Sequence, residues 1–178
     1  TATFTGPGGV TIVRPAFWDG GTTWKVRFAP TKAGNWTMTT SCTISSNSGL
    51  HNISKTVQCN AYSGNLDIYK HGFLKCHESG RYFTYADDTP FFTHERFSTS
   101  NVSGIASQFK YTLDKRVTQG FTVYQTEAIQ HPHGGTHTGM DEEPHCDFRD
   151  GLTSADLPGF QNMDRKFKYI ADNGLVNA

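Results

Sequence analysis

The segment that decides the fold is a ten-residue stretch in the second half of the chain. It reads Gly120-Phe121-Thr122-Val123-Tyr124-Gln125-Thr126-Glu127-Ala128-Ile129. A glycine stands where an amphipathic helix must end, and the apolar, β-branched and aromatic run after it predicts a short buried strand. Polar side chains then follow at the strand's carboxyl end. This order is typical of a parallel α/β unit, in which ligands bind beyond the carboxyl ends of the strands. We therefore expect a small-molecule or sugar site here.

Two amphipathic helices are predicted on either side of this stretch. The first has an apolar stripe of residues four apart, with Ser103 as its candidate cap: Ile105, Phe109, Leu113 and Val117. The second is defined by Met163, Phe167, Ile170 and Ala171, and Gly174 is its expected end. Residues 175–178 would then open a further strand. Strands and helices thus alternate in this half of the chain.

The first 62 residues have a different pattern, that of an all-β module. Trp18-Asp19-Gly20-Gly21 is a strong turn signal, and residues 23–28 and 35–40 alternate on both sides of a second turn. Short strands joined by glycine-rich turns predict a β-sandwich. Alternation places its core around four side chains: Trp24, Val26, Phe28 and Trp36.

Composition excludes several classes of partner. The 178 residues contain 16 Lys and Arg against 16 Asp and Glu, so the net charge is zero. Nucleic-acid and membrane-surface binders usually carry a basic excess, so neither partner is expected. No apolar run approaches the roughly 20 residues of a membrane span. Both ends read as strands entered or cut part-way, so we expect the chain to be a fragment.

Cysteines and glycosylation motifs indicate an exported protein. Cys42 and Cys59 flank a polar loop between two strand-like runs, which predicts a disulfide, the alternative being two buried thiols. Sequons occur at Asn35, Asn52 and Asn101. Together these features favour a secreted, periplasmic or cell-surface location.

One stretch carries a resemblance to a known family. Phe17-Trp18-Asp19-Gly20-Gly21-Thr22-Thr23-Trp24-Lys25-Val26-Arg27-Phe28-Ala29-Pro30, followed by Gly34-Asn35-Trp36-Thr37, resembles the immunoglobulin-like domain that precedes many apiosidase-like glycoside hydrolase barrels. The Gly-Phe-Thr-Val-x-Gln pattern at 120–125 is similar to the family's second barrel strand. At 93–97 the chain reads Thr-His-Glu-Arg-Phe, where the family usually has tryptophan-leucine-glycine-aspartate-threonine.

The resemblance implies a mixed fold in three parts. Residues 1–62 would form an immunoglobulin-like β-sandwich, residues 63–89 a connecting β-hairpin, and residues 90–178 the N-terminal portion of a (β/α)8 TIM-type barrel, truncated. It implies a glycoside hydrolase that acts on a plant or microbial polysaccharide or oligosaccharide. A complete barrel needs roughly 250 residues. The catalytic carboxylates are therefore expected beyond Ala178, and the 178-residue chain alone is expected to be inactive.

Five residues near the expected strand ends are candidates for substrate binding: Gln125, Glu127, His131, Glu95 and His94. An amide such as that of Gln125 donates and accepts at once, which suits paired sugar hydroxyls. Its alternative role is to fasten the neighbouring strand. Glu95 and Glu127 could be mistaken for the catalytic pair, and we interpret them as groups that bind hydroxyls or make ordinary hydrogen bonds.

The loop after this strand invites a metal interpretation. It holds His131, His133, His137, His145 and Cys146, whose side chains suit zinc. Their spacing matches no standard zinc motif, so we expect neither a metal nor another cofactor. Asp141, Glu142 and Glu143 are interpreted as a solvated acidic patch rather than a calcium site.

A non-catalytic carbohydrate-binding or adhesive module is the alternative function. Exposed tryptophans stack on sugars in such modules, and Trp18, Trp24 and Trp36 could form that platform. Alternation favours the core for Trp24 and Trp36. A carbohydrate is the expected partner under both interpretations.

Overall fold

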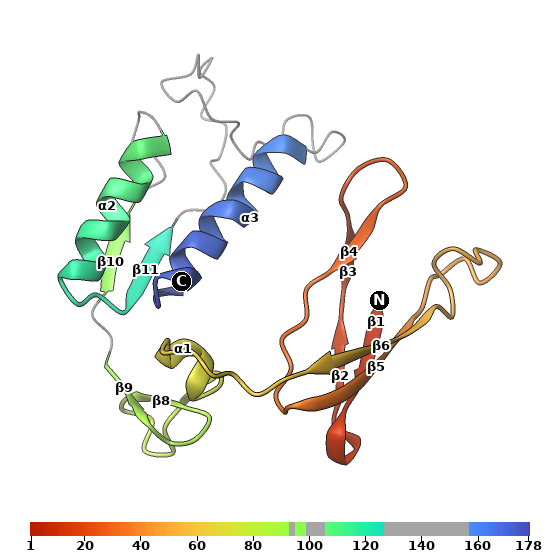
Figure 1. Cartoon of the computed structure of the whole chain (residues 1–178), viewed down its shortest axis with the longest axis horizontal. Helices are drawn as coiled ribbons and strands as arrows, with labels where there is room; N and C mark the ends of the chain where they lie inside the picture. Colours follow the sequence, from red (N-terminus) through yellow and green to blue (C-terminus); the bar gives the residue numbers. More distant parts are fainter. Residues whose placement is uncertain (93–94, 99–105, 127–156) are drawn as a thin grey trace. The chain divides into compact units, whose positions relative to one another are not determined.

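The computed structural model describes residues 1–92, 95–98, 106–126 and 157–178 (Figure 1). The chain divides into two compact units, Thr1–Ser63 and Gly64–Ala178. The described residues form a mixed, strand-rich fold with few helices. Across these ranges, every helix is too short or too polar to cross a membrane.

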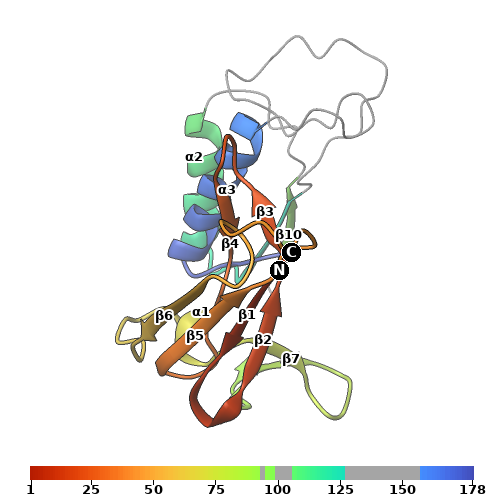
Figure 2. The ribbon, with the colours of Figure 1, turned by 90° about the vertical axis from the view of Figure 1, so that its right-hand side faces the viewer.

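The first unit contains two antiparallel sheets. The larger has the strand order β2-β1-β5-β6, with bounds Thr11–Arg14, Ala2–Thr5, Gly34–Thr40 and Ser54–Cys59. A 3-10 turn, η1, covers Pro7–Gly9. The smaller sheet is a hairpin of β3, Ala16–Trp18, and β4, Trp24–Val26. Pro15 separates β3 from β2, since proline has no N–H to give to a ladder. Figures 1 and 2 show this hairpin projecting away from the larger sheet.

The core of the first unit is built on one tryptophan. Trp36 is 0% exposed and packs with the buried side chains of Ala2 and Phe4. Phe28 stacks on Phe4 at 3.9 Å between ring centroids and meets Trp36 edge-on at 5.1 Å. Trp36 Nε1 donates to the Lys32 carbonyl at 2.9 Å, so the only polar atom of the indole is satisfied.

The expectation that Trp24 belongs to this core is wrong. Trp24 is 49% exposed and Trp18 46% exposed, whereas Val26, two residues further along β4, packs against the core. Alternation identified the shared face of Trp24 and Val26 correctly. It could not show where the covering layer ends, and that layer ends at Val26.

The expected disulfide between Cys42 and Cys59 is absent, and both cysteines are free. Cys59 pairs with Gly34 at one end of the β5–β6 ladder. Cys42 follows β5 at the opposite end, where its N–H donates to His51 Nδ1 at 3.2 Å. The ladder between these ends is roughly 17 Å long, and a disulfide needs Cα atoms within about 7 Å. The antiparallel register therefore separates the two cysteines that the sequence places on either side of one loop.

The second unit begins with a short helix and a small antiparallel sheet, then continues as a parallel sheet with helices. Helix α1 covers Asp67–Lys70. The antiparallel sheet has the order β7-β8-β9, with bounds Leu74–Cys76, Phe83–Tyr85 and Pro90–Phe91. The parallel sheet has the order β10-β11-β12, with bounds Glu95–Ser98, Val123–Thr126 and Val176–Asn177. Helices α2, Ala106–Thr118, and α3, Leu157–Asp172, connect its strands in sequence, giving two β-α-β units.

Both long helices end in the same way, as the sequence predicted. Gly120 and Gly174 adopt φ of 77° and 80°, and each donates its N–H to a carbonyl three residues back, at 3.0 and 2.9 Å. The following residues, Phe121 and Leu175, donate to carbonyls five residues back at 3.1 and 3.2 Å. This is the Schellman arrangement, in which glycine takes the left-handed conformation without a Cβ penalty. The chain then turns directly into the next parallel strand.

Most of the described members of the predicted apolar stripes are confirmed as core residues. Leu113 of α2 and Ile170 of α3 are fully buried and form one cluster with Tyr124 and Leu175. Further members of the stripes pack against that cluster: Phe109, Val117 and Phe167. The two helices therefore bury one side of the parallel sheet.

A second cluster closes the amino ends of the parallel strands. Val123 and Val176 are the first residues of β11 and β12. They pack with Tyr85 and Phe91 of the antiparallel sheet, and with Leu74 beside them. The β7–β9 sheet thus covers one end of the parallel sheet, which leaves the opposite, carboxyl edge as the place for a ligand.

Candidate functional site

The carboxyl ends of the parallel strands lie at one edge of the sheet. Ser98 is in register with Thr126, so β10 and β11 end level with each other. Val123 is in register with Val176, which places β12 beside them in the same direction. The carboxyl ends of parallel strands are where α/β folds bind their ligands. This edge is therefore the candidate site of the second unit.

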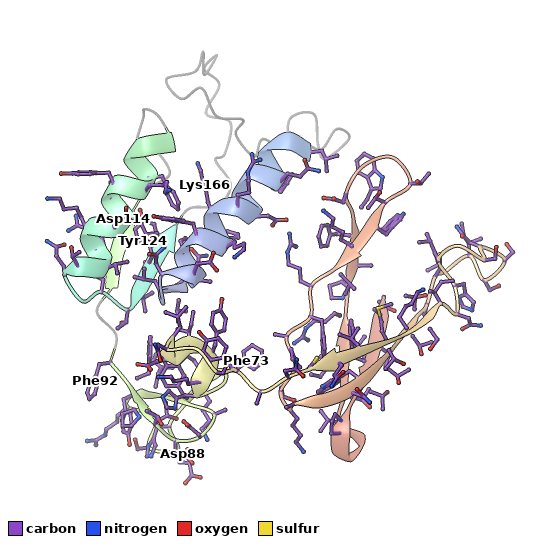
Figure 3. The ribbon with its side chains drawn as sticks, viewed as in Figure 1. Phe73, Asp88, Phe92, Asp114, Tyr124 and Lys166 are labelled. Atoms are coloured by element: carbon purple, nitrogen blue, oxygen red, sulfur yellow. The ribbon has the colours of Figure 1, made fainter. Side chains whose placement is uncertain are left out.

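Gln125 is the candidate residue that the structure describes best. Its neighbour Tyr124 is 2% exposed and lies in the cluster under α2 and α3, with Phe109 edge-on at 6.1 Å (Figure 3). Successive strand residues point to opposite faces, so Gln125 shares a face with Val123. Val123 packs against the amino-end cluster. The half-buried Gln125 amide therefore lies one pleat beyond Val123, on the helix-free face and near the carboxyl edge.

Glu95 lies at the other end of its strand. The sequence placed it near a strand's carboxyl end, and in the structure it is the first residue of β10, level with Val123. The departure from the family pattern at 93–97 made the start of this strand hard to predict. Its position beside the amino ends separates Glu95 from the edge that Gln125 approaches.

The remaining candidates lie outside the described residues. These are His94, Glu127 and His131, together with the loop histidines His133, His137 and His145, the thiol of Cys146, the acidic patch, and the Asn101 sequon. Asn35 and Asn52 are described and exposed, as a glycosylation site requires. Within the described ranges, no three His, Cys, Asp or Glu side chains gather as a metal site would need.

One polar cluster was not foreseen from the sequence. His71 Nδ1 donates to Asp87 Oδ2 at 2.7 Å, and Asp87 Oδ1 accepts the Thr89 N–H at 3.1 Å. The hydrogen bond from His71 is the main reason why the pKa of Asp87 falls to about 2. Burial, with the negative charges of Asp67 and Asp87, raises the pKa of Tyr85, whose ring lies 5.3 Å from that of His71.

This cluster has a structural role. It ties the residue after α1 to the turn between β8 and β9, and Tyr85 belongs to the amino-end cluster. It therefore lies at the end of the sheet opposite the candidate site. The sequence contains a signal for one part of this cluster. In an Asx turn, an aspartate carboxylate accepts the N–H of the residue two positions later, as Asp87 does from Thr89.

Comparison with known proteins now gives the family. Residues 77–178 match the family model described as "Apiosidase-like, catalytic domain". The chain belongs to the apiosidase-like family. Residues 1–43 match a second model, a domain of unknown function (DUF5060). The apiosidase-like match covers both β-α-β units, and the other covers the part of the first unit that contains the β3–β4 hairpin.

A solved structure shares the fold. It is the crystal structure of a "putative glycoside hydrolase" from Bacteroides vulgatus ATCC 8482, 19% identical, with a TM-score of 0.73. The similarity covers 99% of this chain and 35% of that one, so the chain spans about a third of that protein's length. No curated protein matches the chain. The family match shows which catalytic domain these residues belong to, and the solved structure shows that the fold is shared.

Proposed function

We propose that this chain is part of an enzyme that hydrolyses O-glycosidic bonds in a plant or microbial polysaccharide or oligosaccharide. The observation that carries the proposal is the match of residues 77–178 with the apiosidase-like catalytic domain. In the proposal, residues 1–62 are an immunoglobulin-like sandwich, residues 63–89 a connecting hairpin, and residues 90–178 the first units of a (β/α)8 barrel. The enzyme is exported to the carbohydrate on which it acts.

Gln125 is assigned to substrate binding. Its amide can donate to one sugar hydroxyl and accept from the next, and it lies near the carboxyl edge on the face that the helices leave uncovered. Glu127, His131 and His94 are proposed to bind the same substrate, because they follow the ends of strands or adjoin them in sequence. Glu95 is the weakest member of this set, since it begins β10.

The catalytic carboxylates are assigned to other strands of the barrel. Glycosidases use two carboxyl groups on either side of the scissile bond, about 5–5.5 Å apart when retaining and farther apart when inverting. The described residues supply three parallel strands, where a complete barrel has eight. We therefore propose that the pair is contributed by residues beyond Ala178, and that the 178-residue chain by itself has no hydrolase activity.

The test compares the complete gene product with the 178-residue chain. Both are assayed for release of reducing sugar from aryl glycosides, plant polysaccharides and an apiosyl glycoside, the sugar class in the family's name. We expect turnover by the complete protein only. Release by neither protein from any substrate would contradict the proposal. Activity of the short chain that disappears in Glu127→Gln would instead identify an acid within residues 1–178.

The role of Gln125 is tested in the complete protein on the substrate that is turned over. Gln125→Ala should raise KM more than it lowers kcat, with kcat/KM reduced about tenfold or more, since it removes a binding contact. Gln58→Ala is the matched control, because Gln58 is an exposed strand glutamine of the first unit. Unchanged kinetics for Gln125→Ala would assign its amide to fastening the sheet.

A further inference from the structure

Trp18 and Trp24 form a pair of exposed indoles on the β3–β4 hairpin. They are direct cross-strand partners in the antiparallel register, so both project from the same face of the hairpin. Cβ atoms of such partners lie about 5 Å apart. The two side chains are 46% and 49% exposed, whereas Trp36, the third and last tryptophan, is fully buried.

The hairpin holds this pair in a defined geometry. Its turn is closed by two backbone hydrogen bonds, from Asp19 N–H to the Thr23 carbonyl at 3.0 Å and from Thr23 N–H to the Gly20 carbonyl at 2.9 Å. Trp18 Nε1 donates to the Gly21 carbonyl at 3.0 Å, which fixes the indole against the turn. An ion pair between Lys25 and Asp19 spans the base of the same turn.

The hydrogen bond donated by Trp18 Nε1 also limits the contacts that this indole can make with a partner. Its N–H is already used within the turn, so the ring face remains for contact. The Ala16–Val26 pair precedes the tryptophans on the same hairpin face, and Val26 packs against the core. The face is thus apolar along its length, and beyond Val26 it carries two flat, accessible rings.

The area of the pair favours a small flat ligand over a protein. A fully buried aromatic side chain contributes 150–250 Å², so two half-exposed indoles offer roughly 200 Å². A standard protein interface needs about 800 Å² from each partner. Sugar rings present an apolar face of C–H groups that stacks on an indole, and neighbouring indoles can hold successive sugar units. The zero net charge of the chain fits an uncharged glycan.

We propose that Trp18 and Trp24 form a carbohydrate-binding platform in the first unit. It stacks on neutral sugar units of the polysaccharide substrate, and this choice of ligand rests on the proposed hydrolase function. The platform gives a role to a region whose matching family model is a domain of unknown function. In this role it keeps a polymer attached to the enzyme while its bonds are cleaved.

The test is a fluorescence titration of the 178-residue chain with soluble cello-, xylo-, arabino- and galacto-oligosaccharides. Stacking removes water from the two exposed indoles, so we expect a blue shift with at least one of these series, while the buried Trp36 stays silent. Trp18→Ala and Trp24→Ala should each weaken the affinity about tenfold, and the double variant should bind undetectably. Trp18→Tyr and Trp24→Tyr keep an aromatic face and should retain most of the affinity.

Tyr62→Ala is the control, since Tyr62 is an aromatic residue of the same unit with 45% exposure. Circular dichroism checks that every variant is folded, and gel electrophoresis in xylan, arabinan or galactan repeats the test with neutral polymers. Absence of binding by the wild-type chain in both formats would overturn the platform, as would equal binding by the double variant. Either result leaves the hydrolase proposal intact if the complete protein still cleaves a glycoside.

Discussion

The two units build their cores around aromatic residues in different ways. The antiparallel unit buries Trp36 in a core made of its own strands and leaves Trp18 and Trp24 exposed. The parallel unit buries Tyr124 beneath two helices and covers its amino ends with Tyr85 and Phe91. Among the described strands, β10 and β12 each pair with β11 alone, so these two outer strands each lack a described partner on one side. Local antiparallel pairing completes the core of the first unit, whereas the described part of the parallel sheet has an unpaired outer side on β10 and on β12.

The largest expected effect is a difference in amide exchange between the two units of the intact chain. Amides of β1 and β5 should exchange slowly, and those of α2, β11 and α3 faster by an order of magnitude or more, because open parallel edges and helix faces are weakly stabilised. Hydrogen–deuterium exchange with mass spectrometry measures both units at once. Limited proteolysis should cut first between residues 62 and 72. Equal protection of the two units would contradict the comparison and imply that another chain completes the sheet.

A single substitution should reverse the order of the amide exchange rates in the two units. Trp36→Ala removes the fully buried indole around which the first core is built, and should lower the free energy of unfolding of that unit by about 3–5 kcal/mol. Exchange should then become faster in residues 1–63 than in α2 and α3. Trp18→Ala, an exposed tryptophan of the same unit, is the control and should change exchange little. Slow exchange of β1 in Trp36→Ala would show that the core does not depend on this residue.

The smallest expected effect is a change in the acid stability of the second unit. The pKa of Asp87 is about 2 in the folded chain, below its ordinary 3.8, chiefly through the His71 hydrogen bond. The stability that this carboxylate contributes is therefore complete above about pH 4 and is lost as the pH falls towards 2. Asp87→Asn should speed exchange around β8 at pH 6 and remove part of the acid sensitivity between pH 4 and 2.

Asp88→Asn provides the control for this pH effect. Asp88 follows Asp87 in the same turn and makes an exposed ion pair with Lys75 at 2.7 Å (Figure 3). Exposed pairs contribute little to stability, so this variant should keep the wild-type acid profile. An Asp87→Asn chain whose acid profile is also unchanged would show that the His71 contact does not stabilise the fold.

Elements set by local chemistry could be predicted from the sequence. Gly120 and Gly174 ended their helices as expected, because the left-handed conformation that ends a helix is specified by a single residue next to the apolar stripe. The stripe around Leu113 could be placed for the same reason. The Cys42–Cys59 pairing failed because it depended on strand register, which links residues far apart in the sequence. Trp24 failed because alternation identifies a face and gives no information about what covers it.

The candidate site was predictable to a similar extent. The position of Gln125 near the carboxyl end of a buried strand followed from the glycine and the apolar run before it. The position of Glu95 along its strand depended on where β10 begins. The sequence around Glu95 contains no comparable signal that marks this boundary. The His71–Asp87 pair joins two turns 16 residues apart, so only the folded chain brings these side chains together.

The repeated glycine ends of α2 and α3 also determine how the family can vary. After Gly120 and Gly174 the chain enters the next strand within two or three residues, so each αβ connection has a nearly fixed length. The connection from β11 to α3, between Thr126 and Leu157, is many times longer. Insertions and deletions in relatives should therefore accumulate on the carboxyl side and leave strand spacing unchanged. In such an architecture, substrate preference can diverge while the scaffold is inherited intact.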